Sequence, residues 1–95
     1  MSDTAVLRAR WAVRRAARHL AEDAPRLAAG SAGSAGAYQV GLASRTADLR
    51  RAALTAWLFG VPEHVVAADG RVPVTVVHEW IEAAFSPGRS GSARP

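Results

Sequence analysis

Histidine is the residue type in this sequence best suited to proton transfer, and the chain has three histidines. His19 follows a basic stretch and His64 stands beside Glu63, so both are expected at the surface. His78 differs, because it lies inside the apolar run Val76–Ile81. Two interpretations of His78 stay open: a core residue whose ring nitrogens are satisfied, or a catalytic base.

Other catalytic and cofactor chemistry finds little support in the sequence. The chain has no cysteine, which excludes a disulfide, a thiolate metal site and a thiol nucleophile. The spacing of histidines and acids matches no metal-ligand pattern. The glycine-rich segment 28–37, AAGSAGSAGA, lacks the Lys and the following Ser/Thr of a phosphate-binding loop. We therefore expect no metal and no cofactor.

Residues 5–22 are predicted to form a helix with two different faces. An apolar stripe recurs at helical spacing, and Pro25 is expected just past the helix end. The stripe consists of Val6, Ala9, Val13, Ala16, Ala17 and Leu20. The opposite face carries Arg8, Arg10, Arg14, Arg15 and Arg18, with Leu7 and Trp11 in its middle.

Three interpretations of this basic face with Leu7 and Trp11 are open. The two apolar side chains can pack on the rest of the domain, with arginine stems lying along them. They can instead contact a partner protein, for which Arg8, Arg14, Arg15 and Arg18 would supply the rim. Nucleic acid or an anionic membrane surface is the third possibility, because Trp can stack on bases while Arg contacts phosphates.

The chain is thus predicted to divide into a basic amphipathic helical segment at 1–29, a flexible linker at 30–37, a small core domain at 38–87 and a disordered tail at 88–95. Residues 38–42 are expected to be a strand or an extended lead-in. A buried helix then runs from Ser44 or Thr46 to about Phe59, and Gly60 ends it. Six β-branched valines and the pair Asp69-Gly70 favour a β-hairpin with a strand over 71–82, although a helix over 74–85 competes.

Three short motifs in the core resemble one enzyme superfamily. The string HEWIE at 78–82 reads H-x-W-[IV]-E, GVPEHVV at 60–66 is similar to Gly-Ile-Pro-x-x-Val-Val, and GLASRTA at 41–47 resembles G-[VL]-C-x-x-x-A. These motifs are those of transglutaminase-like cysteine hydrolases, and the leader peptidases of lasso-peptide maturation are the most similar type. The resemblance implies an α+β fold, in which a basic N-terminal helix, a linker and a buried central helix precede a β-hairpin.

The same resemblance implies site residues and partners. His78 would be the base, Trp80 and Ser44 would line the cleft, and Ala43 occupies the nucleophile position. No aspartate follows Asp69 to orient the base. Because Ala43 carries no nucleophile, the chain would be an inactive mutant or a pseudoenzyme that binds peptide. Its partners would be a precursor or leader peptide and, through the N-terminal helix, a leader-recognition protein.

The alternative is an all-α, helix-turn-helix protein that binds DNA and is similar to small excisionases. In that reading Val72-Pro73 begins the second helix, Val77 and Trp80-Ile81 pack inside, and Pro87 and Arg89 form a wing. The exposed face of the second helix would then carry Thr75, His78, Glu79 and Glu82. Two carboxylates facing phosphates count against this alternative.

Charge and hydropathy limit the partners further. The net charge is +4, and every basic residue is arginine. Residues 1–29 carry six arginines against three acids (+3), while residues 38–95 carry six against five (+1). This charge suggests an acidic partner for the N-terminal helix, but a chain with arginine alone as its basic residue and 22 alanines is also typical of ordinary surfaces encoded by a GC-rich genome, so both interpretations stay open. No apolar run is long enough for a membrane span and no secretory signal is visible, so we expect a cytoplasmic protein.

Overall fold

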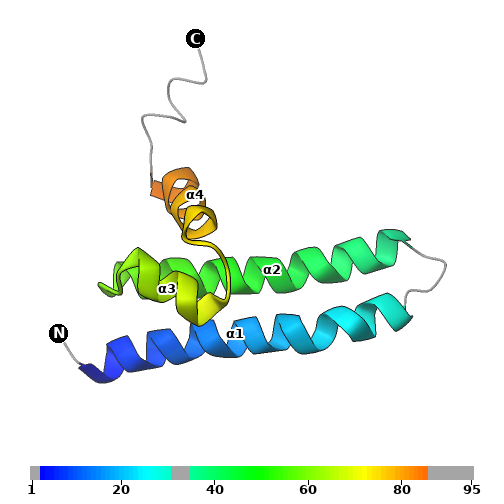
Figure 1. The fold of residues 1–95 in the computed structure, drawn as a ribbon, viewed down its shortest axis with the longest axis horizontal. Coiled ribbons are helices and arrows are strands. Elements are labelled where there is room, and N and C mark those ends of the chain that lie inside the picture. The colour runs from blue at the N-terminus through cyan, green and yellow to red at the C-terminus, as the bar shows by residue number, and fades with distance from the viewer. Residues whose placement is uncertain (1–2, 31–34, 86–95) are drawn as a thin grey trace, which may run out of the picture.

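The computed structural model describes residues 3–30 and 35–85, and every regular element within these ranges is a helix (Figure 1). The four helices are α1 (Asp3–Gly30), α2 (Ala35–Leu58), α3 (Glu63–Gly70) and α4 (Val74–Phe85). The described residues contain no strand. None of these helices is long and apolar enough to cross a membrane.

The long helices α1 and α2 form an antiparallel hairpin, and they lie side by side along most of their length (Figure 1). Small residues line the seam, which lets the two backbones approach closely. Ala9, Val13 and Ala17 of α1 are buried, and so are Leu49, Ala53 and Ala56 of α2. The predicted apolar stripe of the first helix is thus confirmed as its buried face.

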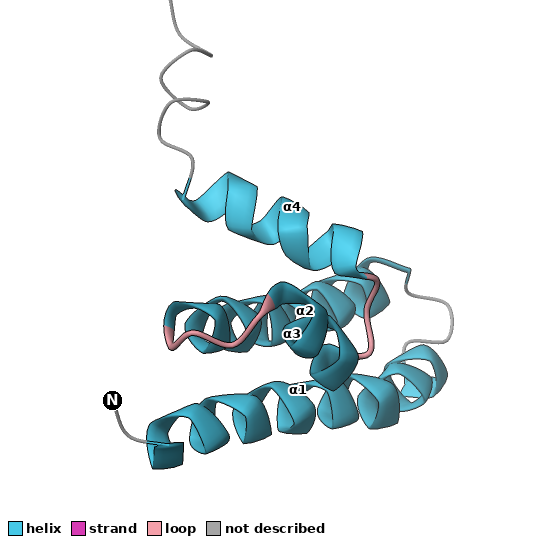
Figure 2. Cartoon of the chain, turned by 60° about the vertical axis from the view of Figure 1, so that its left-hand side comes forward, coloured by secondary structure: helices cyan, strands magenta, loops and turns pink. Residues whose placement is uncertain are grey.

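Two short helices complete the core at one end of this hairpin. α3 packs on both long helices, and α4 packs on α3 and α2. Both views place α4 on the side of α2 and α3 that faces away from α1 (Figure 2). The side chains of Val13, Leu49, Val66 and Val77 are fully buried, one from each helix. These four residues join all four helices into one core.

Gly60 ends α2, as the sequence predicts. Its φ of 99° is in the left-handed region, which glycine adopts without steric cost. The N–H of Val61 donates to the carbonyl of Ala56 (3.1 Å), and the N–H of Gly60 donates to that of Trp57 (2.9 Å). This pair of hydrogen bonds is the Schellman motif, which satisfies carbonyls at a helix end. Pro62 then leads into α3.

The predicted β-hairpin is wrong, because the 71–82 strand is replaced by α4. Asp69 and Gly70 form the last turn of α3 rather than a two-residue hairpin turn. In α4 the buried residues Val77 and Ile81 are four positions apart, so they share one helix face against the core. This contact with α2 and α3 outweighs the strand preference of the valines, since β-propensity depends strongly on packing.

Two predicted boundaries are also wrong. Residues 38–42 belong to α2, which begins at Ala35, and α1 continues through Pro25 to Gly30. Arg45 of α2 pairs with Asp23 of α1 at 2.7 Å, so the two helices are in contact just past the predicted end of the first. The second half of α2 is not buried all round either, since Leu58 is 63% exposed.

The α+β transglutaminase-like fold is therefore a wrong prediction, and the all-α alternative fits the structure. A transglutaminase-like hydrolase needs its histidine on a strand, whereas His78 lies on α4. The predicted disordered tail at 88–95, the proposed wing residues Pro87 and Arg89, and residues 31–34 of the predicted linker lie outside the described residues.

Candidate functional site

Helices α3 and α4 are joined by a tight turn of residues 71–73. Arg71 has a φ of 58°, in the left-handed region, and its N–H donates to the carbonyl of Ala68 (3.3 Å). The N–H of Val72 donates to the carbonyl of Ala67 (3.1 Å), which completes a second Schellman motif. Pro73 directly precedes α4, and its carbonyl accepts hydrogen bonds from the N–H groups of Val76 and Val77. A short turn therefore redirects the chain sharply between two helices.

Helix α4 crosses α3 steeply (Figure 2). One face of α4 is buried and the opposite face is exposed. Val77 and Ile81 are buried, and Trp80 packs partly buried against the core, as the helix-turn-helix reading predicts. The opposite side, which we call the outer face of α4, consists of Val74, Thr75, His78, Glu79 and Glu82. Val74 is 45% exposed. At the far end Phe85 stacks on Trp57 of α2, with ring centroids 5.4 Å apart.

His78 occupies the middle of the outer face and contacts two carboxylates. Its Nδ1 lies 3.2 Å from Oε1 of Glu63 in the first turn of α3, and its Nε2 lies 3.7 Å from Oε2 of Glu82. The side chain of His78 is 57% exposed, so it is neither a satisfied core residue nor a base in a closed site. Glu63 and Glu82 hold the ring at the α3–α4 junction.

The other residues expected in a catalytic cleft do not join His78 through any polar contact. Ala43 and Ser44 lie exposed on α2, and Trp80 is half-buried in the core. Within the described residues, no hydrogen bond or ion pair connects His78 with Ser44. Ala43 lines a shallow hollow formed by α2 alone, with Gln39, Leu42, Thr46, Ala47 and Arg50. A nucleophile–base arrangement finds no support in these positions.

Asp69 is the one buried ionised side chain in the described core, and sequence analysis assigned it to a turn. Asp69 is only 8% exposed, and its carboxylate accepts three hydrogen bonds from α1. Arg10 donates from Nε to Oδ2 (2.9 Å) and from Nη2 to Oδ1 (3.3 Å), and Arg14 donates from Nε to Oδ1 (3.0 Å). Arg10 and Arg14 are four positions apart, so the sequence indicates that they share one face of a helix. It does not indicate their partner, because Asp69 is more than fifty residues away.

The pairing of Asp69 changes its acidity. Burial by itself would raise the pKa of Asp69, but the hydrogen bonds from Arg10 and Arg14 outweigh burial and lower the pKa below its ordinary value. The hydrogen bond to Asp69 likewise raises the pKa of Arg10. The result is a stable charged link between α1 and the end of α3, next to the turn that precedes α4.

Leu7 and Trp11 remain on the surface of α1, where they are 53% and 60% exposed. Packing of these side chains on their own domain is therefore not observed. Arg8, Arg15 and Arg18 are exposed on the same helix, while Arg14 is engaged with Asp69. The expectation that this face contacts a partner remains a prediction.

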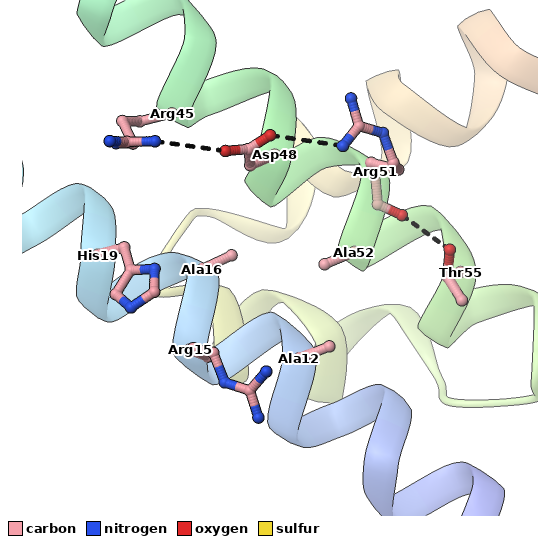
Figure 3. Close-up of a pocket in the computed structure, with 9 residues that line it drawn as sticks. All are labelled: Ala12, Arg15, Ala16, His19, Arg45, Asp48, Arg51, Ala52 and Thr55. Atoms are coloured by element: carbon pink, nitrogen blue, oxygen red, sulfur yellow. Dashed lines mark hydrogen bonds and ion pairs between the residues drawn. The ribbon is translucent and has the colours of Figure 1, made fainter.

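A groove lies between α1 and α2, with three alanines and six polar or charged residues in its lining (Figure 3). Ala12, Ala16 and Ala52 form its floor, and its volume is about 300 Å³. On the α2 side of the groove Asp48 pairs with Arg45 and Arg51, and Thr55 Oγ1 donates to the carbonyl of Arg51 (3.0 Å). The small seam residues leave room for this groove, and His19 and Arg15 of α1 also line it.

The described residues contain no cluster of three or more His, Asp or Glu side chains that could hold a metal ion. No protein-family model, curated protein or solved structure matches the chain. The family resemblance of the short motifs thus has no support beyond the motifs themselves. The leader peptide and the leader-recognition protein were implied by that resemblance alone, and no contact in the structure tests them.

Proposed function

We propose that α3 and α4 form a helix-turn-helix unit that binds duplex DNA, with α4 as the helix that enters the major groove. The observation that carries this proposal is the three-residue turn at 71–73, which leads from α3 into a helix with one buried and one exposed face. Helix-turn-helix units consist of two helices at a steep angle joined by such a turn. A single α-helix fits the major groove of B-form DNA.

The side chains on the outer face of α4 suit base contacts near the start of the helix. In helix-turn-helix proteins the N-terminal residues of the second helix contact base edges. Val74 and Thr75 occupy the first turn of α4, where they suit contact with a thymine methyl group and a hydrogen bond to a base edge. His78 and Glu79 follow one turn later, and a carboxylate there can accept a hydrogen bond from N4 of cytosine.

Glu79 and Glu82 are unfavourable on a DNA-binding helix if they lie near phosphates, because negative side chains there weaken binding. In the proposed arrangement α4 lies in the groove against the bases, and arginines outside α4 meet the phosphates. Glu63 and Glu82 both lie beside the ring of His78. Glu79 is therefore the carboxylate of α4 best placed to accept a hydrogen bond from a DNA base. Helix α4 carries two acids and no arginine (−2), so the rest of the chain has a net charge of +6.

The proposal predicts a preference for cytosine at one position of the binding site. Duplexes enriched by the protein from a randomised library would be tested by fluorescence anisotropy at fixed salt. Glu79→Gln is expected to weaken discrimination at that position by about 1–3 kcal/mol while leaving affinity for other duplexes unchanged or increased. Glu22→Gln is the matched control, because Glu22 is an exposed carboxylate on α1.

Two outcomes would contradict the proposal. One is the absence of any duplex binding at low salt. The other is binding in which Thr75→Ala, Glu79→Gln and Glu22→Gln leave the sequence preference equally unaffected. Far-UV circular dichroism of each variant serves to show that the helices are retained.

A further inference from the structure

A second feature beside the α3–α4 turn is a polar hollow with a volume of about 420 Å³. Arg14 and Arg18 border it from α1, and Arg71 borders it from the turn. Ala68 and Asp69 of α3 form the rest of its lining. Three guanidinium groups from two segments that are far apart in sequence thus surround one open space.

Asp69, the only carboxylate that lines this hollow, is already hydrogen-bonded to arginines of α1. Asp69 accepts hydrogen bonds from Arg10 and from Nε of Arg14, so it cannot neutralise the remaining groups. Within the described residues, the side chains of Arg18 and Arg71 have no ion-pair partner. The bond from Nε of Arg14 leaves the terminal nitrogens of Arg14 outside its pair with Asp69. The hollow therefore carries an uncompensated positive charge.

The backbone of Arg71 adds an independent observation. Arg71 occupies the position after the helix end at which glycine is preferred, and its φ of 58° is costly for a residue with a Cβ. Gly60 fills the equivalent position after α2 at no such cost. Strained backbone of this kind is found preferentially at functional sites. At this position the arginine side chain borders the same hollow as Arg14 and Arg18 of α1.

We infer that the hollow bordered by Arg14, Arg18 and Arg71 binds a phosphate group of the DNA backbone next to the bases that α4 contacts. Guanidinium groups bind phosphate oxygens through paired N–H donors, and three of them converge here. This inference rests on the proposed DNA-binding function, and it assigns the phosphate contact that α4 itself lacks. It also explains why a module with an acidic recognition helix can bind a polyanion.

The test compares the salt dependence of duplex binding among matched arginine variants. Arg18→Gln and Arg71→Gly each remove one charge from the hollow, whereas Arg8→Gln and Arg50→Gln each remove one exposed arginine elsewhere. Each hollow variant is expected to lower the affinity about tenfold near 0.1 M salt and to reduce the slope of log K against log salt by about 1. The control variants are expected to leave the slope unchanged.

A second titration separates this inference from the function on which it rests. Pyrophosphate is added to the protein without DNA, and the arginine Nε–H signals are followed by NMR. If duplexes bind through α4 but the hollow variants behave like the controls, the hollow assignment is overturned and the function stands. If no duplex binds while pyrophosphate shifts the Arg18 and Arg71 signals, the hollow holds a free phosphate compound and the DNA assignment is overturned. If neither ligand binds, both are overturned.

Discussion

At the scale of single residues, the pairing of Asp69 links acidity to stability. The pKa of Asp69 is lower in the folded chain than in the unfolded chain, because Arg10 and Arg14 stabilise its charged form. A group with a lowered folded pKa stabilises the fold above its unfolded pKa and loses that contribution as pH falls through its folded pKa. The contribution of Asp69 is therefore complete above about pH 4 and declines below it.

The corresponding prediction compares the natural chain with Asp69→Asn. Near neutral pH the variant is expected to be less stable by on the order of 2 kcal/mol, since it loses hydrogen bonds to a charged group. Urea unfolding between pH 6 and pH 2.5 gives both free energies of unfolding. The difference between the two proteins should shrink steadily below pH 4. A difference that stays constant down to pH 2.5 would show that Asp69 does not contribute through its charge.

Arg71 allows stability and binding to be separated. Its left-handed conformation costs an L-residue more than glycine, so Arg71→Gly is expected to raise the free energy of unfolding by about 1 kcal/mol. The same substitution removes one guanidinium from the hollow. Thermal unfolding monitored by circular dichroism checks the first effect. A variant that unfolds at a lower temperature than the natural chain would mean that the Arg71 side chain stabilises the fold rather than serving a ligand.

At the scale of elements, α4 shows where reasoning from the sequence succeeds and where it fails. The pattern of Val77, Trp80 and Ile81 correctly indicates an inward face in the helical reading. The valine content favours a strand over the same residues, and only the contact with α2 and α3 decides between them. Gly60 and the apolar stripe of α1 were predictable, because local backbone and periodicity determine them.

Docking of α4 can be tested with two valines of the same helix. Val77 is 1% exposed and Val74 is 45% exposed, so the two differ in burial while sharing residue type and helix. Val77→Ala is expected to lower the free energy of unfolding by about 2 kcal/mol, because it leaves a cavity in the core. Val74→Ala should change it by less than about 0.5 kcal/mol. Equal effects in urea unfolding would contradict the assignment of the inner and outer faces of α4.

At the scale of the whole molecule, α1 packs against α3 and places the positive charges of Arg14 and Arg18 beside the turn that precedes α4. Arg10 and Arg14 reach Asp69 across more than fifty residues of sequence, which no local pattern predicts. The candidate site was therefore only partly predictable: His78 and its neighbours on α4 stood out as a sequence motif, but the hollow did not. Residues that meet through tertiary contact carry no fixed spacing in the chain.

In the function we propose, α4 contacts duplex DNA through its outer face. The most direct measurement is a ¹H–¹⁵N NMR titration of the full chain with a duplex enriched from a randomised library. The largest shift changes are expected at residues 71–82, with smaller changes at Arg14 and Arg18, and all should diminish as salt is raised. Shift changes confined to Leu7, Trp11 and their neighbours, with α4 unaffected, would contradict the claim.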